Sequence, residues 1–231
     1  MLNFFEHYFP NVISLGWSTD LGWGTAIWQT LYMTFVSAFF GGILGLLFGF
    51  GLVLFDTNGI LANRPIFWIL DKIVSIFRAI PFIILLAFIS PLTQLLVNTQ
   101  IGMTAALVPL SLGVFPFYAR QVQNALVSVD HGIIEAAQAF GATTGEIIFK
   151  VYLREALADL IRVSTVTLIS LVGLTAMAGA IGSGGLGNVA ISVGFNRFQN
   201  DVTWVATLLI IVFIFAIQFT GDLLAKHASH K

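Results

Sequence analysis

Long stretches of this chain contain no charged residue, and the charged positions gather between them. The charge-free runs cover residues 21–55, 79–119, 163–196 and 202–221. A helix needs about 20 apolar residues to cross the hydrocarbon core of a membrane. The second run is too long for one crossing, and polar residues at 93–102 mark a place where the chain can leave the bilayer and turn. The pattern therefore predicts five spans.

The composition agrees with this interpretation. Of the 231 residues 58% are hydrophobic and 9% are charged, and the mean hydropathy is +0.95. We therefore predict an all-α integral membrane protein. The spans are expected at residues 28–55, 73–92, 101–118, 163–181 and 204–219. Residues 1–24 are expected to form an external extension, residues 25–226 the transmembrane domain, and residues 227–231 a cytoplasmic tail.

The positive charges orient the chain, because cytoplasmic loops carry the excess of Lys and Arg. Under the five-span layout, nine basic residues fall on one side: Arg64, Lys72, Arg78, Arg120, Lys150, Arg154, Arg162, Lys226 and Lys231. Only Arg197 falls on the other side. The amino terminus is therefore predicted to lie outside and the carboxyl terminus in the cytoplasm.

The composition also limits the chemistry. There is no cysteine, which excludes disulfides, thiolate metal sites and cysteine nucleophiles, and a net charge of -1 suggests no nucleic-acid partner. No predicted span has an acid, a Lys or a His near its middle, which argues against an internal proton relay. Arg78 and Arg120 are expected near inner ends of spans, where long side chains reach the interface. We expect no catalytic residue and no metal site.

Small residues repeat in the first predicted span. Ser37, Gly41, Gly45 and Gly49 recur every fourth residue, a pattern that lets another helix approach closely. Packing within the chain is favoured over a dimer seam. A second glycine cluster, Gly182, Gly184 and Gly187, has the GxGxxG spacing but follows an apolar span rather than a strand, so we predict a flexible external turn.

The fourth predicted span contains uncharged polar positions. Thr167, Ser170 and Thr175, with Met177 close by, are candidates for a translocation path. The alternative is that these hydroxyls bond only to carbonyls of their own helix.

A polar segment at residues 130–153 separates the third and fourth spans. Ile133, Ala136, Ala137 and Phe140 follow the spacing of one apolar helix face, and Gly141 can end that helix. Thr143 followed by Glu146 fits a capping box that starts a second helix with Ile147, Ile148 and Val151 on its apolar face. The segment therefore predicts a cytoplasmic helix-turn-helix.

The charges of this segment indicate what it contacts. Lys150 is the only Lys or Arg from 130 to 151, against Asp130, Glu135 and Glu146. A helix that lies on lipid usually carries several Lys or Arg residues on its polar face. Docking into a groove on a partner protein fits better.

The same residues resemble a known family. Glu135, Ala136 and Ala137, then Gly141 and the VYL at 151–153, are similar to the EAA loop of permease subunits of ABC importers. Arg154 replaces the usual proline after the closing leucine. Four further segments resemble the permease of bacterial methionine importers: FRAIPFIILL (77–86), VPLSLGVFPFYARQVQNAL (108–126), TLISLVGLTAMAGAIGSGGLG (167–187) and QFTGD (218–222).

The resemblance implies a type I ABC importer permease fold in the bacterial cytoplasmic membrane. Two copies would form a path for D- or L-methionine within membrane lipid, and each would bind one of two ATPase subunits. ATP and Mg would then belong to the ATPase, with no cofactor in this chain, and an extracytoplasmic methionine-binding protein or lipoprotein would deliver the substrate. The residues implied in ATPase coupling are Ile133, Glu135, Ala136, Ala137, Phe140, Gly141, Thr143, Glu146, Ile147 and Lys150.

Other readings stay open at this point. An ABC permease could carry another amino acid, a phosphonate or a quaternary amine. An ion-coupled carrier or a channel would need no ATPase, but such carriers often show inverted repeats and this chain shows none. An intramembrane enzyme would need a nucleophile with its base, or a metal cluster, at membrane depth, and the sequence offers only scattered hydroxyls there.

Overall fold

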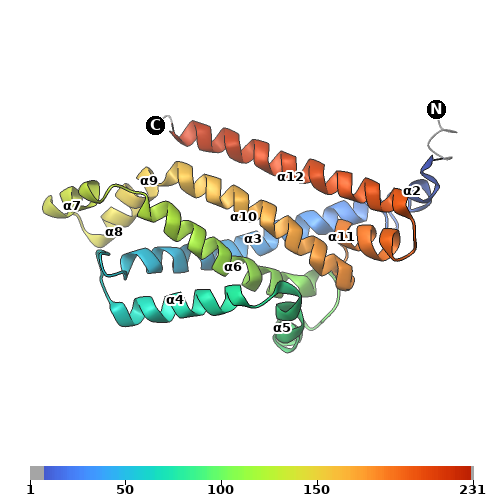
Figure 1. The fold of residues 1–231 in the computed structure, drawn as a ribbon, viewed down its shortest axis with the longest axis horizontal. Coiled ribbons are helices and arrows are strands. Elements are labelled where there is room, and N and C mark those ends of the chain that lie inside the picture. The colour runs from blue at the N-terminus through green and yellow to red at the C-terminus, as the bar shows by residue number, and fades with distance from the viewer. Residues whose placement is uncertain (1–7, 230–231) are drawn as a thin grey trace.

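Four long apolar helices run roughly side by side and form the body of the molecule (Figure 1). In a computed structural model that describes residues 8–229, these are α3 (Trp23–Leu54), α6 (Met103–Val127), α10 (Leu157–Ala178) and α12 (Asn200–Ser229). The π-helical segment η2 (Gly179–Ser183) continues α10. Each of the four is long and apolar enough to cross a membrane. All regular elements between residues 8 and 229 are helical, as the sequence predicted.

The second predicted span is not one helix. It is divided into α4 (Arg64–Ala79) and α5 (Phe82–Val97), which meet at an angle of 110°. Ile80 is extended (φ -79°, ψ 119°) because a residue before proline avoids the helical region, and α5 begins directly after Pro81. The span predicted at residues 73–92 is therefore made of two helices that meet at a proline. The count of five spans holds when this bent pair is taken as one.

Helix lengths differ from the predicted spans, and three further prolines lie inside helices. Pro91 lies inside α5, and Pro109 and Pro116 lie inside α6, so only Pro81 separates two helices. Helix α6 extends nine residues beyond its predicted end, to Val127, and α12 extends ten beyond its own, to Ser229. Hydropathy detects the apolar part of a helix, whereas the hydrogen-bonded backbone continues past it.

The glycine repeat brings α3 into contact with α6. A Cβ atom built on Gly45 would lie 2.7 Å from Cδ1 of Tyr118, and one built on Gly49 would lie 2.6 Å from Cβ of Val122. Both separations are shorter than side chains tolerate, so the two backbones approach closely only because glycine is present. The predicted packing within the chain is confirmed.

The second glycine cluster forms an ordered reversal rather than a flexible turn. Positive φ angles at Gly182, Gly184 and Gly185 turn the chain after η2. The short helix α11 (Gly185–Asn188) and η3 (Val189–Phe195) then pack against α3 and α12. Gln29 accepts a hydrogen bond from the Gly185 amide at 2.7 Å. Side chains of α3 thus hold this reversal in place.

The predicted N-terminal extension is attached to the bundle where the structure describes it. Its short helix α2 (Pro10–Ser14) lies beside the start of α12, where Asp201 accepts bonds from the backbone and side-chain nitrogens of Asn11, both at 3.0 Å. The indole nitrogen of Trp23 also donates to the Val12 carbonyl at 2.9 Å. Residues 1–7 of the predicted extension lie outside the described part.

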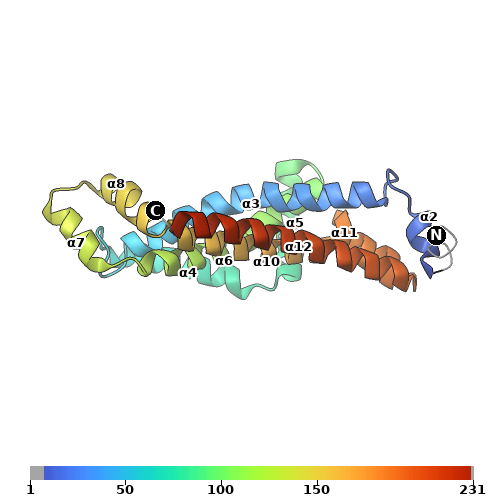
Figure 2. The same cartoon turned by 90° about the horizontal axis from the view of Figure 1, so that it is seen from above.

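The two ends of the bundle differ in what they carry. Helix α2 and the α11 reversal lie at one end, whereas the segment between α6 and α10 lies at the other, near the end of α12 (Figures 1 and 2). This arrangement follows from an odd number of crossings.

Adding one methyl group at Gly49 tests the close packing of α3 against α6. Gly49→Ala places a Cβ against Val122 and the Ala119 carbonyl oxygen, and we expect it to lower the free energy of unfolding by about 1–3 kcal/mol. Gly42→Ala is the control, since a Cβ there meets nothing within 4 Å. Thermal unfolding in detergent measures both. Equal melting temperatures for the two variants would contradict the proposed packing.

Candidate functional site

A short helical segment between α6 and α10 projects from the end of the bundle (Figure 2). It consists of α7 (His131–Ala139), α8 (Thr144–Glu146), the π-helical η1 (Ile147–Tyr152) and α9 (Leu153–Glu155). The side chain of Asp130 caps α7 by accepting a hydrogen bond from the Gly132 amide at 2.7 Å. The predicted helix-turn-helix is present here, and we call residues 130–155 the end segment.

Gly141 ends α7 as predicted. Its φ is +79°, its amide donates to the Gln138 carbonyl at 2.9 Å, and the Ala142 amide donates to the Ala137 carbonyl at 3.0 Å. These two bonds form a Schellman turn, which needs a left-handed residue after the helix. A side chain would meet no neighbour here, so glycine is required by its backbone angle rather than by space.

The predicted capping box starts the next helix. The Thr143 hydroxyl accepts from the Glu146 amide at 3.4 Å, and the Glu146 carboxylate accepts from the Thr143 amide at 3.0 Å. Lys150 donates to the same carboxylate at 2.8 Å. The bond from Lys150, followed by those from Thr143, lowers the pKa of Glu146 to about 2. Glu146 is therefore ionised at neutral pH, and these bonds are lost only as the pH falls toward 2.

The second helix is not the regular α-helix that the sequence predicted. After α8 the chain takes a π-helical turn over Ile147–Tyr152 before α9. Ile147 and Tyr152 are five residues apart and both are buried. Five residues point in different directions on an α-helix, but the wider π turn, with its i to i+5 bonds, brings them onto one face.

Three side chains attach the end segment to the bundle. Ile134, Ile147 and Tyr152 are buried in one cluster with residues such as Val53 of α3 and Leu126 of α6. Ile133, which apolar spacing had placed on the buried face, is 42% exposed, whereas its neighbour Ile134 is 3% exposed. With two adjacent isoleucines, apolar spacing alone does not select which one is buried.

The predicted coupling residues are all in the end segment, and most face outward. Ile147 is the one buried member, and Ala137 and Glu146 are half-buried. The exposed members are Ile133, Glu135, Ala136, Phe140, Gly141, Thr143 and Lys150. Phe140 is 93% exposed, and Phe149, which was not among the predicted coupling residues, is 71% exposed. Exposed apolar side chains next to a fixed backbone are typical of a protein-binding surface.

The candidate path residues of α10 differ in exposure, and their hydroxyls bond within the helix. The hydroxyls of Thr167, Ser170 and Thr175 each donate to a carbonyl of their own helix, at 2.7, 3.0 and 2.7 Å. Thr175 is buried, Ser170 is half-buried with its hydroxyl near the surface, and Met177 is 38% exposed. Their part in a path stays a prediction.

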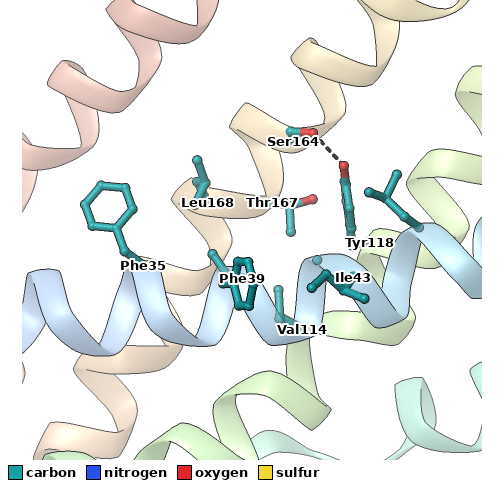
Figure 3. A pocket seen from close by; sticks show the side chains of 11 residues that line it. Phe35, Phe39, Ile43, Val114, Tyr118, Ser164, Thr167 and Leu168 are labelled. Carbon is teal, nitrogen blue, oxygen red and sulfur yellow. Dashed lines mark hydrogen bonds between the residues drawn. The ribbon is translucent and has the colours of Figure 1, made fainter. Parts of the chain in front are cut away.

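A cavity of about 350 Å³ lies between α3, α6 and α10 (Figure 3). Phe35, Phe39 and Ile43 form its α3 side, and Thr167 lines it from α10. Within it the Tyr118 hydroxyl and the Ser164 hydroxyl are 2.7 Å apart. The remaining walls are largely apolar. In residues 8–229 no group of three or more His, Asp or Glu side chains is placed to hold a metal ion.

Comparison with known proteins agrees with the sequence resemblance. Residues 41–230 match the family described as binding-protein-dependent transport system inner membrane component. The chain is 46% identical over 222 residues to the methionine import system permease protein MetP of Bacillus subtilis, covering 96% of this chain and 97% of the relative. It is 45% identical over 212 residues to the probable D-methionine transport system permease protein MetI of Haemophilus influenzae, covering 90% and 100%.

Solved structures show the same fold. A chain of the inward-facing MetNI methionine ABC transporter aligns with a TM-score of 0.86 at 44% identity, covering 88% of this chain and 94% of that one. A chain of an amino acid ABC transporter crystallised with histidines aligns with a TM-score of 0.73 over 98% and 97% of the two chains, and at 18% identity it supports the fold alone. This chain therefore has the type I ABC permease fold and belongs to the family of inner membrane components of binding-protein-dependent transport systems.

Proposed function

We propose that this chain is the permease subunit of an ATP-driven methionine importer, in which two copies form the translocation path. The observation that carries the proposal is the match at 46% identity, over almost the full length of both chains, to a methionine import permease. In this scheme the chain catalyses no reaction. A separate ATPase binds ATP and Mg, and a binding protein outside the cell delivers methionine.

The end segment is proposed to face the cytoplasm. Lys150 and Arg154 belong to it, and Arg64 and Lys226 lie at the start of α4 and near the end of α12. Arg197 lies between η3 and α12, at the opposite end. The excess of basic residues at one end supports this orientation, because cytoplasmic loops carry more Lys and Arg.

The end segment is proposed to be the contact with the ATPase. The Schellman turn at Gly141 and the capping box at Thr143 fix α7 and α8 relative to each other. Ile133 and Phe140 then present apolar surface that a cleft in a partner can bury. Ile134 and Ile147 are buried against the bundle. A force on the exposed face of the end segment therefore moves the ends of α3, α6 and α10.

We propose that movement of the end segment is transmitted to the translocation path through α10. The Ala156 amide donates to the Tyr152 carbonyl at 2.9 Å, and the Leu160 amide donates to the Ala156 carbonyl at 2.8 Å, so hydrogen bonds continue from η1 into α10. Arg154, where the family usually has proline, keeps an amide that proline lacks. When ATP closes the ATPase dimer, the two end segments approach each other and the spans rock toward an outward-open state.

Substrate is proposed to enter at the end that carries α2 and the α11 reversal. From there it would pass along α10, where Thr167, Ser170, Thr175 and Met177 are the candidate path residues. These four residues are uncharged and weakly polar, which suits passage of an apolar thioether side chain.

A substitution at Gly141 tests whether the contact with the ATPase depends on the Schellman turn. Gly141→Val forces a β-branched residue to φ +79°, and we expect the turn to open and ATP-driven methionine uptake to fall about tenfold or more. Gly145→Ala is the matched control, because both glycines have open space around them but only Gly141 has a positive φ. Uptake into proteoliposomes measures both, and normal uptake by Gly141→Val would refute the role of the turn.

Phe140→Asp tests the exposed surface of the end segment as the contact with the ATPase. Loss of a buried aromatic contact weakens binding by about 1.5–3 kcal/mol, so we expect the ATPase to stop co-purifying while the chain still inserts into the membrane. Phe198→Asp at the opposite end is the control, since Phe198 is 90% exposed and Phe140 is 93% exposed. If both variants retain the ATPase equally, Phe140 does not contact it.

A further inference from the structure

Arg78 lies nearer the middle of the membrane than the sequence suggested, and the residue is exposed on the surface of the single chain. It is in the last turn of α4, two residues before the break at Ile80 and Pro81. The end of α4 meets α6 near Gly113, which lies about 15 Å along α6 from Met103 at 1.5 Å per residue. When Met103 is placed at the outer edge of a hydrocarbon core of about 30 Å, Gly113 and the end of α4 lie close to its middle. A charged residue at that depth is costly and generally functional.

Arg78 borders a cavity at the break between α4 and α5. The cavity has a volume of about 260 Å³, just below the range of about 300–1,000 Å³ usual for ligand pockets, which suits a ligand as small as an amino acid. Phe77, Phe82 and Phe117 supply aromatic walls from α4, α5 and α6. Gly113 leaves the space open, since a Cβ there would lie 3.0 Å from Cδ2 of Phe82.

The charge of Arg78 is not neutralised by the carboxylate on its own helix. Asp71 pairs with Arg120 of α6 at 2.7 Å, and Arg120 also donates to Gln123 at 2.8 Å. Among residues 8–229, no salt bridge includes Arg78. A guanidinium carries a permanent positive charge and binds a carboxylate with two parallel hydrogen bonds. The group is therefore available to an anionic ligand.

The broken helix adds two complementary dipoles. The first amides of α5 lack partners within the helix and form its positive end, whereas the last carbonyls of α4 form a negative end. In transporters, paired helix ends of this kind bind the charged groups of a substrate at membrane depth. A zwitterion has both charges that such a pair can bind.

We propose that this cavity holds the transported amino acid during its passage. The guanidinium of Arg78 and the start of α5 bind its α-carboxylate, and the end of α4 binds its ammonium group. Phe77, Phe82 and Phe117 contact its apolar side chain, for which a thioether is well suited because sulfur packs favourably against aromatic rings. This inference rests on the proposed function as a methionine importer.

The test uses the complete transporter in proteoliposomes, with its ATPase and binding protein. Methionine uptake is measured with a radiolabel, and contact is mapped with a diazirine analogue of methionine followed by mass spectrometry. We compare Arg78→Gln with Lys72→Gln, which removes an exposed cation of the same helix that lies 5.9 Å from the Trp68 ring and outside the cavity. Arg78→Lys, which keeps the charge but not the paired donors, is the conservative variant.

We expect the diazirine to label the wild type in α4, α5 or α6 around the cavity. Arg78→Gln should reduce both this label and uptake about tenfold or more while the ATPase still co-purifies. Lys72→Gln should match the wild type, and Arg78→Lys should fall between the two.

Labelling at other residues, uptake by Arg78→Gln within twofold of the wild type, or lost uptake with undiminished labelling would each overturn the cavity assignment. If the wild type itself transports no methionine, the proposed function fails, and the inference fails with it.

Discussion

A chain that crosses lipid must satisfy its backbone hydrogen bonds within itself, and this constraint determines where the present structure is regular and where it is not. Helices α3, α6, α10 and α12 meet it because their backbone groups bond within each helix, and each is long enough to cross the membrane. The break at Ile80 and Pro81 does not, because helix ends there are left without partners inside the bundle. Irregular backbone at membrane depth is tolerated where it lines a cavity, and a cavity with one arginine lies at this break.

Close packing joins this irregular region to the rest of the bundle. The glycine contact places α6 directly against α3, and α6 in turn holds α4 through the Asp71–Arg120 pair. The same helix reaches the end segment, where Leu126 packs with Ile134. A shift of the end segment therefore acts on α6, α10 and the broken helix together. Such a connection between a surface that binds a partner and a cavity that binds a solute is what an ATP-driven permease requires.

Local signals in the sequence predicted several of these features. The glycine spacing in α3, the glycine stop at Gly141 and the capping box at Thr143 each depend on residues within a few positions of one another, and the structure has all three. The five-span count also followed from the apolar runs, once the bent pair is taken as one span.

Features that depend on long-range packing were missed. Apolar periodicity could not choose Ile134 over Ile133, because the bundle decides which side of α7 is covered. The π-helical turn was missed for the same reason, since it forms to bury Ile147 and Tyr152 together. Arg78 was expected near the inner end of its span, because the sequence does not show how far α4 reaches along α6. These residues are positioned by neighbours that lie far away in the sequence.

The central claim is that this chain transports methionine only when an ATPase drives it. The most direct measurement is uptake of labelled methionine by proteoliposomes that contain the chain, the ATPase and the binding protein, with and without ATP. We expect saturable uptake that needs all three proteins and stops when ATP is replaced by a non-hydrolysable analogue. Uptake by the chain alone, driven by an ion gradient, would contradict the account and indicate a secondary carrier.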